Sequence, residues 1–229
     1  MSPAVSPLAP KNVPDMPEIA GVRLATAQAG IRYVGRTDVL LALFDEGTTA
    51  AGVFTKSKCP SAPVEWCRAH LKSGKNKSAK NLARALVVNS GNANAFTGKS
   101  GRAAVEAQVA RITSRLGCQP HEVFTASTGV IGVPLPIDKA EAGVDAAFAA
   151  APASWEEAAA TIGTTDTFPK GAVQRAVLGD RPVSLAGIVK GSGMIMPDRA
   201  TMLGFIVTDA AVAPAFLQEM LSAANRQSF

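Results

Sequence analysis

The stretch KGSGMIMPDRATML, residues 190–203, is the most informative part of this chain. It places a small residue, Ala200, directly before a hydroxyl residue, Thr201, between a glycine-rich loop and an apolar run. A chain that cuts itself between these two residues exposes Thr201 as a new N-terminus. An N-terminal threonine combines a nucleophilic hydroxyl with an α-amine that can accept its proton, and that amine has an ordinary pKa of about 7.7–8.0. The stretch therefore predicts a self-cleaving threonine nucleophile.

Three further segments place hydroxyl or amide groups near the ends of expected strands. STGVIG, residues 127–132, can direct backbone N–H groups and a hydroxyl at one point, as an oxyanion hole requires, or it can form a plain turn. TTDTFPK, residues 164–170, can bind a ligand through its hydroxyls or brace a loop. NSGNANAFTG, residues 89–98, can form a site wall or a tightly packed turn, because glycine and asparagine tolerate positive φ.

The composition is that of an ordinary globular protein, with 229 residues, 47% of them hydrophobic and 18% charged. The net charge of +5 admits an anionic ligand. Basic residues cluster only in residues 72–80, with no aromatic residue among them, so we do not expect nucleic-acid binding. No apolar run approaches the ~18 residues of a membrane span.

The three cysteines, Cys59, Cys67 and Cys118, are odd in number and lack the spacing of metal ligands. Reduced cytoplasmic thiols are the simplest interpretation. Neither His70 nor His121 belongs to a motif that would activate a thiol. We therefore expect a cytoplasmic protein without a metal site.

Apolar periodicity and turn residues predict alternating strands and helices after a loose, proline-rich arm over residues 1–20. The final strand is apolar on both faces, so it is expected to be an interior strand where both neighbours are present and an exposed apolar edge where one is lacking. Expected strands cover residues 39–45, 50–55, 83–90, 121–127, 172–178, 182–190 and 202–209, and expected helices cover residues 101–116, a segment starting at 138, 154–160 and 214–225.

Five motifs in order, VVNSGNANA, ASTGVIG, TTDTFPK, KGSGMI and ATML, resemble those of the ornithine acetyltransferase family, the bifunctional glutamate N-acetyltransferases of arginine biosynthesis. The resemblance extends from about Gly21 to the end of the chain. It implies an α/β (α+β) fold of the aminopeptidase-like, N-terminal-nucleophile-like type, with sheets sandwiched by helices. It also implies a precursor that cleaves itself into α and β chains, which commonly remain together as an α2β2 heterotetramer.

The resemblance assigns roles to residues by their place in these motifs. Lys190 is expected to bind the carboxylate or the acetyl-bearing end of the substrate and to have no structural pairing role. The implied residues are the nucleophile Thr201, the scissile bond Ala200–Thr201, the oxyanion-hole residues Thr128 and Gly129, and the substrate contacts Thr167 and Lys190.

The implied reaction is a ping-pong acetyl transfer. N2-acetylornithine gives its acetyl group to Thr201, and glutamate then takes the group from the resulting ester. Some members of the family also accept acetyl-CoA, which makes it a second candidate donor. Acyl transfer through an oxyanion needs no metal or redox cofactor.

The resemblance divides the chain into the arm at residues 1–20, an α-chain-like region at 21–200 and the start of a β-chain-like region at 201–229. The chain stops 28 residues after Thr201, whereas the family continues for most of a further domain. We therefore expect a truncated β-chain-like region. Two alternatives stay open: a related amidase or aminopeptidase that uses water as acceptor, and an inert α-chain-like fragment.

Overall fold

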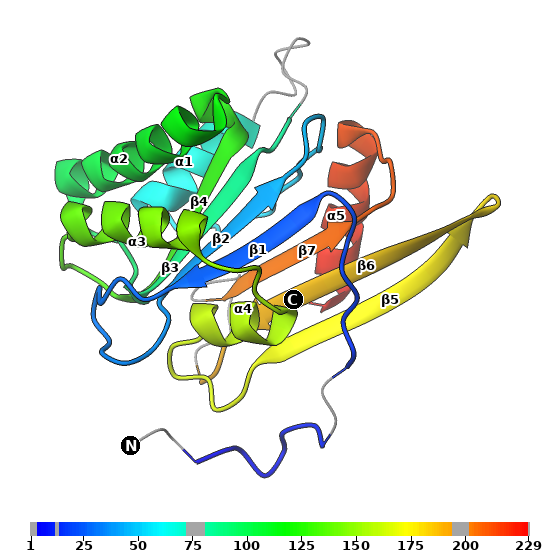
Figure 1. Ribbon diagram of the computed structural model, residues 1–229, viewed down its shortest axis with the longest axis horizontal. Helices are drawn as coiled ribbons and strands as arrows, with labels where there is room; N and C mark the ends of the chain where they lie inside the picture. Colours follow the sequence, from blue (N-terminus) through cyan, green and yellow to red (C-terminus); the bar gives the residue numbers. More distant parts are fainter. Residues whose placement is uncertain (1–3, 12–13, 72–80, 194–201, 229) are drawn as a thin grey trace.

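The computed structural model describes residues 4–11, 14–71, 81–193 and 202–228. It contains two β-sheets with helices packed against them (Figure 1). The first sheet has the order β1–β2–β3–β4, and only the β3–β4 pair is parallel. The second sheet is antiparallel, with the order β5–β6–β7. The strands are β1 (Val22–Ala27), β2 (Val39–Phe44), β3 (Ala85–Asn92), β4 (Val123–Val130), β5 (Lys170–Leu178), β6 (Arg181–Lys190) and β7 (Leu203–Thr208).

The helices are distributed over both faces of the first sheet (Figure 1). Helices α1, α2 and α3 cover one face, whereas α4 and the second sheet cover the other. The short 3-10 turn η2 (Pro120–Glu122) leads into β4. The helices are α1 (Ala62–Leu71), α2 (Gly98–Leu116), α3 (Ile137–Ala149), α4 (Trp155–Ile162) and α5 (Pro214–Ser228). This mixed α/β architecture agrees with the predicted class.

Strand β3 separates two hydrophobic cores. Val87 packs with Ile112 of α2 in the first core, and the next residue, Val88, packs with Ile162 of α4 and Ile188 of β6 in the second. Successive side chains of a strand point to opposite faces of the sheet, so a strand covered on both faces must be apolar at every position. The prediction of a buried strand at this place in the sequence is confirmed.

The expected strand at residues 50–55 is wrong, and β2 pairs with β1 instead. The backbone N–H of Gly52 donates to Oε1 of Gln218 in α5 at 3.0 Å, and Nε2 of Gln218 donates to the carbonyl of Gly52 at 3.1 Å. The N–H of Ala50 donates to the carbonyl of Asn81. These tertiary partners satisfy backbone groups that a strand would pair in a ladder.

Strand β7 forms an edge of its sheet in the described part of the chain, where it pairs only with β6. Phe205 and Val207 pack against the second core, whereas Ile206 is 64% exposed. Among these residues β7 is therefore an edge strand with an exposed apolar side chain, as expected for a strand that lacks its second neighbour. The apolar pattern of the strand predicts cover on both faces, but only one face is covered.

The last residues of the proline-rich arm are packed against the body. Ile19 is buried in the second core, and Met16 packs against the same core. The indole N–H of Trp155 in α4 donates to the carbonyl of Pro17 at 2.9 Å. The arm therefore contributes to the packing of α4 from residue 16 onward.

Local signals in the sequence set the ends of two helices. Gly117 adopts φ 64° after α2, and its N–H donates to the carbonyl of Thr113, which is a glycine cap at the C-terminus. At α4, the hydroxyl of Ser154 accepts from the N–H of Glu157, and the Glu157 carboxylate accepts from the N–H of Ser154. The C-terminal end of α2 and the N-terminal end of α4 therefore lie within one residue of the ends expected from the sequence.

Replacing Ser154 with alanine should lower the free energy of unfolding by about 1 kcal/mol, because the N–H of Glu157 loses its acceptor. Ser154→Thr keeps the hydroxyl and should stay within about half of that loss. Urea denaturation followed by circular dichroism measures both variants. Equal stabilities of the alanine and threonine variants would show that the cap does not stabilise α4.

Candidate active site

Three of the predicted motifs meet where β4 and β6 end. Lys190 lies at the end of β6, Thr128 lies in β4, and Thr164 lies in the loop between α4 and β5. The Nζ atom of Lys190 donates to Oγ1 of Thr128 at 3.1 Å and to Oγ1 of Thr164 at 2.9 Å. Lys190 is 5% exposed and Thr128 is 8% exposed. The cluster is therefore a nearly water-free polar site that joins the two sheets.

The ammonium group of Lys190 is in an unfavourable environment for its charge. Burial lowers the pKa of Lys190 below its ordinary value, the Asp166 carboxylate raises it, and the Lys170 ammonium lowers it further. Moving a charge out of water disfavours its ionised form, and burial is the largest of these effects on Lys190.

The expectation that Lys190 has no structural pairing role is wrong, because the residue links two hydroxyl groups. This pairing has a consequence for Thr128. A threonine hydroxyl has one proton to donate and two lone pairs. Since Oγ1 of Thr128 accepts from Lys190, its own proton is available for a different acceptor.

Gly129 occupies a position that only glycine fits. Its φ is +137°, and the register of β3 and β4 shifts opposite it, between Gly91 and Asn92. A Cβ atom at Gly129 would lie 2.3 Å from the backbone carbon of Gly91 and 2.6 Å from the nitrogen of Asn92. The close approach of the two backbones therefore shapes the chain directly after Thr128.

The structure describes only some of the remaining predicted residues. Thr167 lies in the same loop as Thr164 and is half-buried, and its role as a substrate contact stays a prediction. Ala200 and Thr201 lie outside the described residues. Leu203, two residues after Thr201, is the register partner of Lys190. Sequence reasoning missed Thr164, although the density of hydroxyls in TTDTFPK was the signal that pointed to it.

The segment NSGNANAFTG forms a packed turn. Oδ1 of Asn92 accepts from the N–H of Asn94 at 2.7 Å, and Nδ2 of Asn94 donates to the carbonyl of Gly101 at 2.9 Å. Oδ1 of Asn89 accepts from the hydroxyl of Ser127 at 2.6 Å. These side chains are used internally, which favours the packed turn over a site wall for the asparagines.

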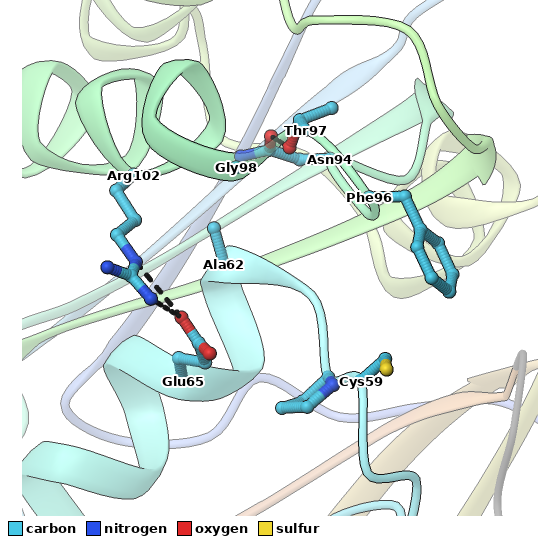
Figure 2. Close-up of a pocket in the computed structure, with 9 residues that line it drawn as sticks. Cys59, Ala62, Glu65, Asn94, Phe96, Thr97, Gly98 and Arg102 are labelled. Carbon is cyan, nitrogen blue, oxygen red and sulfur yellow. Dashed lines mark hydrogen bonds and ion pairs between the residues drawn. The ribbon is translucent and has the colours of Figure 1, made fainter.

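A pocket of about 160 Å³ lies between the starts of α1 and α2 (Figure 2). Figure 2 shows Arg102 directed toward Glu65, with Nη2 and Oε2 3.2 Å apart. The pocket is also lined by Asn94 and Cys59. Part of the segment at residues 89–98 lines it, but among the described residues Thr128, Gly129, Thr167 and Lys190 do not. We therefore place the candidate active site at Lys190 and Thr128.

The buried Cys67 does not suit nucleophilic catalysis. Burial raises the pKa of the Cys67 thiol to about 11, although its hydrogen bonds with Thr125 oppose the shift, and the thiolate is the reactive form. The Cys59, Cys67 and Cys118 thiols are unpaired in the structure. Within the described residues, no three His, Cys, Asp or Glu side chains are grouped as metal ligands. None of the described helices is long and apolar enough to cross a membrane.

Gly129→Ala should lower the free energy of unfolding by at least about 2 kcal/mol, because the methyl group collides with the Gly91 backbone. Gly132→Ala is the matched control, since Gly132 also has positive φ but has nothing within 4 Å of an added Cβ. The control should cost only the ~1–2 kcal/mol of a left-handed conformation. Urea titration measures both. Equal losses would show that the backbones of β3 and β4 are not tightly apposed there.

Comparison with known proteins agrees with this geometry. The model of the ArgJ family matches residues 23–229. The chain is 58% identical to the arginine biosynthesis bifunctional protein ArgJ of Nitrobacter winogradskyi and 60% identical to that of Bradyrhizobium diazoefficiens. Each alignment covers 100% of this chain and 54% of the relative. The chain thus spans about half the length of the curated relatives it matches.

Two solved structures share the fold. One is the arginine biosynthesis bifunctional protein ArgJ of Bacillus halodurans, with a TM-score of 0.66, 28% identity and coverage of 81% of this chain and 92% of that chain. The other is ornithine acetyltransferase from Mycobacterium tuberculosis complexed with ornithine, with a TM-score of 0.64, 35% identity and coverage of 80% and 94%. The N-terminal-nucleophile-like fold class is thereby confirmed, and the chain belongs to the ArgJ family.

Proposed function

We propose that this chain carries the acetyl-transfer site of an enzyme that moves an acetyl group from N2-acetylornithine to glutamate in arginine biosynthesis. The observation that carries the proposal is the hydrogen bond from buried Lys190 to Thr128, next to the glycine-only position 129. It leaves the Thr128 hydroxyl able to donate to a developing negative charge. The M. tuberculosis protein with the same fold is complexed with ornithine, which supports the choice of substrate.

Thr201 is the proposed nucleophile, with Ala200–Thr201 as the bond that self-cleavage breaks. Support comes from the register of the second sheet, since Leu203 pairs with Lys190. Two residues of chain reach about 7 Å at most, which supports the choice of Thr201 as the nucleophile of a site at this end of β6. The α-amine that cleavage would free supplies the base.

In the first half of the proposed reaction, Oγ1 of Thr201 attacks the acetyl carbonyl of N2-acetylornithine while the α-amine takes the hydroxyl proton. The carbonyl oxygen becomes an oxyanion, to which Thr128 and the backbone at Gly129 donate. The C–N bond then breaks, ornithine leaves with the proton, and Thr201 holds the acetyl ester. In the second half, the amine of glutamate attacks the ester, and the Thr201 hydroxyl is restored.

Lys190 and Thr167 are the proposed substrate contacts. Both belong to segments that meet at the polar cluster, and a buried ammonium group can bind a substrate carboxylate strongly. Acetyl-CoA as a second donor, assembly into an α2β2 heterotetramer and a cytoplasmic location belong to the same proposal. The unpaired thiols of the three cysteines support the cytoplasmic location.

The chain spans about half the length of its relatives, so activity should be assayed in two proteins. One is the 229-residue chain, and the other is a chimaera in which the C-terminal part of the Bradyrhizobium relative follows Phe229. An active protein should consume acetylornithine only when glutamate is present. Release of acetate without glutamate would instead identify a hydrolase.

Thr201→Ala in the chimaera should abolish both self-cleavage and acetyl transfer, because one hydroxyl performs both attacks. Denaturing gels and intact mass spectrometry report the cleavage and the acetylated intermediate. Thr201→Ser keeps a hydroxyl and should retain cleavage. Two chains on the gel of the alanine variant would place the cleavage site elsewhere.

Thr128→Ala should reduce kcat by about 10²–10³, which is typical for the loss of one oxyanion donor. Thr164→Ala is the control, since Thr164 also accepts from Lys190 but is not an oxyanion donor in this proposal. Its loss of kcat should be smaller. Steady-state kinetics of the chimaera give both values, and a Thr128→Ala rate within about threefold of the parent would remove Thr128 from the mechanism.

A further inference from the structure

Asp166 is a buried carboxylate that neither the motif assignments nor the proposed mechanism uses. It lies in the loop between α4 and β5, and its side chain is 6% exposed. Oδ1 accepts from the backbone N–H of Gly191 at 2.9 Å and from Nζ of Lys170 at 2.5 Å, and Oδ2 accepts from the N–H of Thr164 at 3.3 Å. One carboxylate therefore links the backbone at the end of β6 to the α4–β5 loop and to the Lys170 ammonium at the start of β5.

Two of these partners are directly connected to Lys190. Gly191 is the next residue in the chain, and Thr164 accepts a hydrogen bond from the Lys190 ammonium. The Asp166 carboxylate thus holds the backbone of Gly191, which follows the lysine, and the backbone of Thr164, whose hydroxyl accepts from the lysine. The other hydroxyl is that of Thr128.

The charges reinforce this arrangement. Among the described residues, the charged groups that act on Lys190 are Asp166 and Lys170, which lies at the start of β5. Burial opposes ionisation of Asp166, yet the hydrogen bonds from Lys170, Gly191 and Thr164 hold the pKa of its carboxyl below the usual value. Asp166 is therefore charged at neutral pH, and among the described residues its negative charge stabilises the Lys190 ammonium.

We propose that Asp166 is a positioning residue for acetyl transfer: its carboxylate holds Thr164 and Gly191 on either side of Lys190, so that the ammonium stays against Oγ1 of Thr128. The role of Asp166 in catalysis rests on the proposed function. Its role in holding Lys190 in place rests on the hydrogen bonds alone. A carboxylate that only stabilised the loop would fix the backbone but would not affect the protonation state of Lys190.

Two substitutions separate these roles, because they break the same ion pair with opposite effects on Lys190. Asp166→Asn removes the negative charge and should lower the pKa of Lys190. Lys170→Gln removes the neighbouring positive charge and should raise it. Loop damage alone would act alike in both variants.

NMR titration of the 229-residue chain with ¹³Cε- and ¹⁵Nζ-labelled lysine measures the pKa directly. Loss of one resonance in Lys190→Met assigns the signal. Shifts in opposite directions in Asp166→Asn and Lys170→Gln support the proposal. Shifts in the same direction, or no shift in Asp166→Asn, overturn it.

If Asp166→Asn does not fold, a pH titration of the unaltered protein tests the proposal instead. As pH falls and Asp166 protonates, the Lys190 resonance should show a second step in the acid range while the amide spectrum remains native. A Lys190 signal that stays constant through that range overturns the proposal.

Kinetics of the active chimaera then test the catalytic meaning. Asp166→Asn should lower kcat by at least about tenfold, since small displacements of a catalytic constellation are costly, and should shift the pH profile, whereas Asp166→Glu should restore part of the rate. Unchanged kcat with a displaced Lys190 pKa would refute the positioning role in catalysis. A parent chimaera without transferase activity, together with the NMR shifts, would refute the proposed function and leave the geometric inference standing.

Discussion

The buried ammonium group of Lys190 is the constraint on which the site depends. Moving a charge into a protein interior is costly unless polar groups surround it, and the structure supplies two threonine hydroxyls at 2.9 and 3.1 Å. These hydroxyls come from opposite sides of the cluster, one from a strand of the first sheet and one from the loop that follows α4. The solvation of one charge therefore constrains how the loop after α4 lies against the two sheets.

The hydrophobic cores serve the same arrangement. The second core brings α4, β6 and the inner face of the first sheet together, and the loop after α4 then lies where Lys190 can reach it. The packed arm contributes through the hydrogen bond from Trp155 to Pro17. Helices α1 to α3 cover the opposite face, and the pocket of Figure 2 lies between the starts of α1 and α2.

Local signals predicted the parts of the fold that depend on nearby residues. The glycine after α2, the capping box of α4 and the turn between β5 and β6 are set by contacts within a few residues. Strand β1, helix α1 and the irregular course of residues 50–55 were not foreseen. The course around Gly52 depends on Gln218, 166 residues away, and no local pattern contains that information.

In the site, too, local motifs could be predicted and contacts between distant segments could not. The motifs identified Thr128, Gly129 and Lys190, and the structure places Lys190 against Thr128 as one cluster. The hydroxyl pairing of Lys190 and the roles of Thr164 and Asp166 could not be predicted, because they depend on the docking of the α4–β5 loop on β6. The sequence marks that loop as rich in polar groups but does not say which of them face the lysine.

The contact between Lys190 and Thr128 joins residues that are 62 positions apart and lie in different sheets. Hairpins such as β5–β6 close within microseconds, whereas contacts between distant segments and parallel strand pairs such as β3–β4 form slowly. The polar cluster is thus assembled only when both sheets have formed and docked. A newly made chain that has folded only in part keeps these groups separated, so the chemistry of the cluster is restricted to molecules that have completed folding.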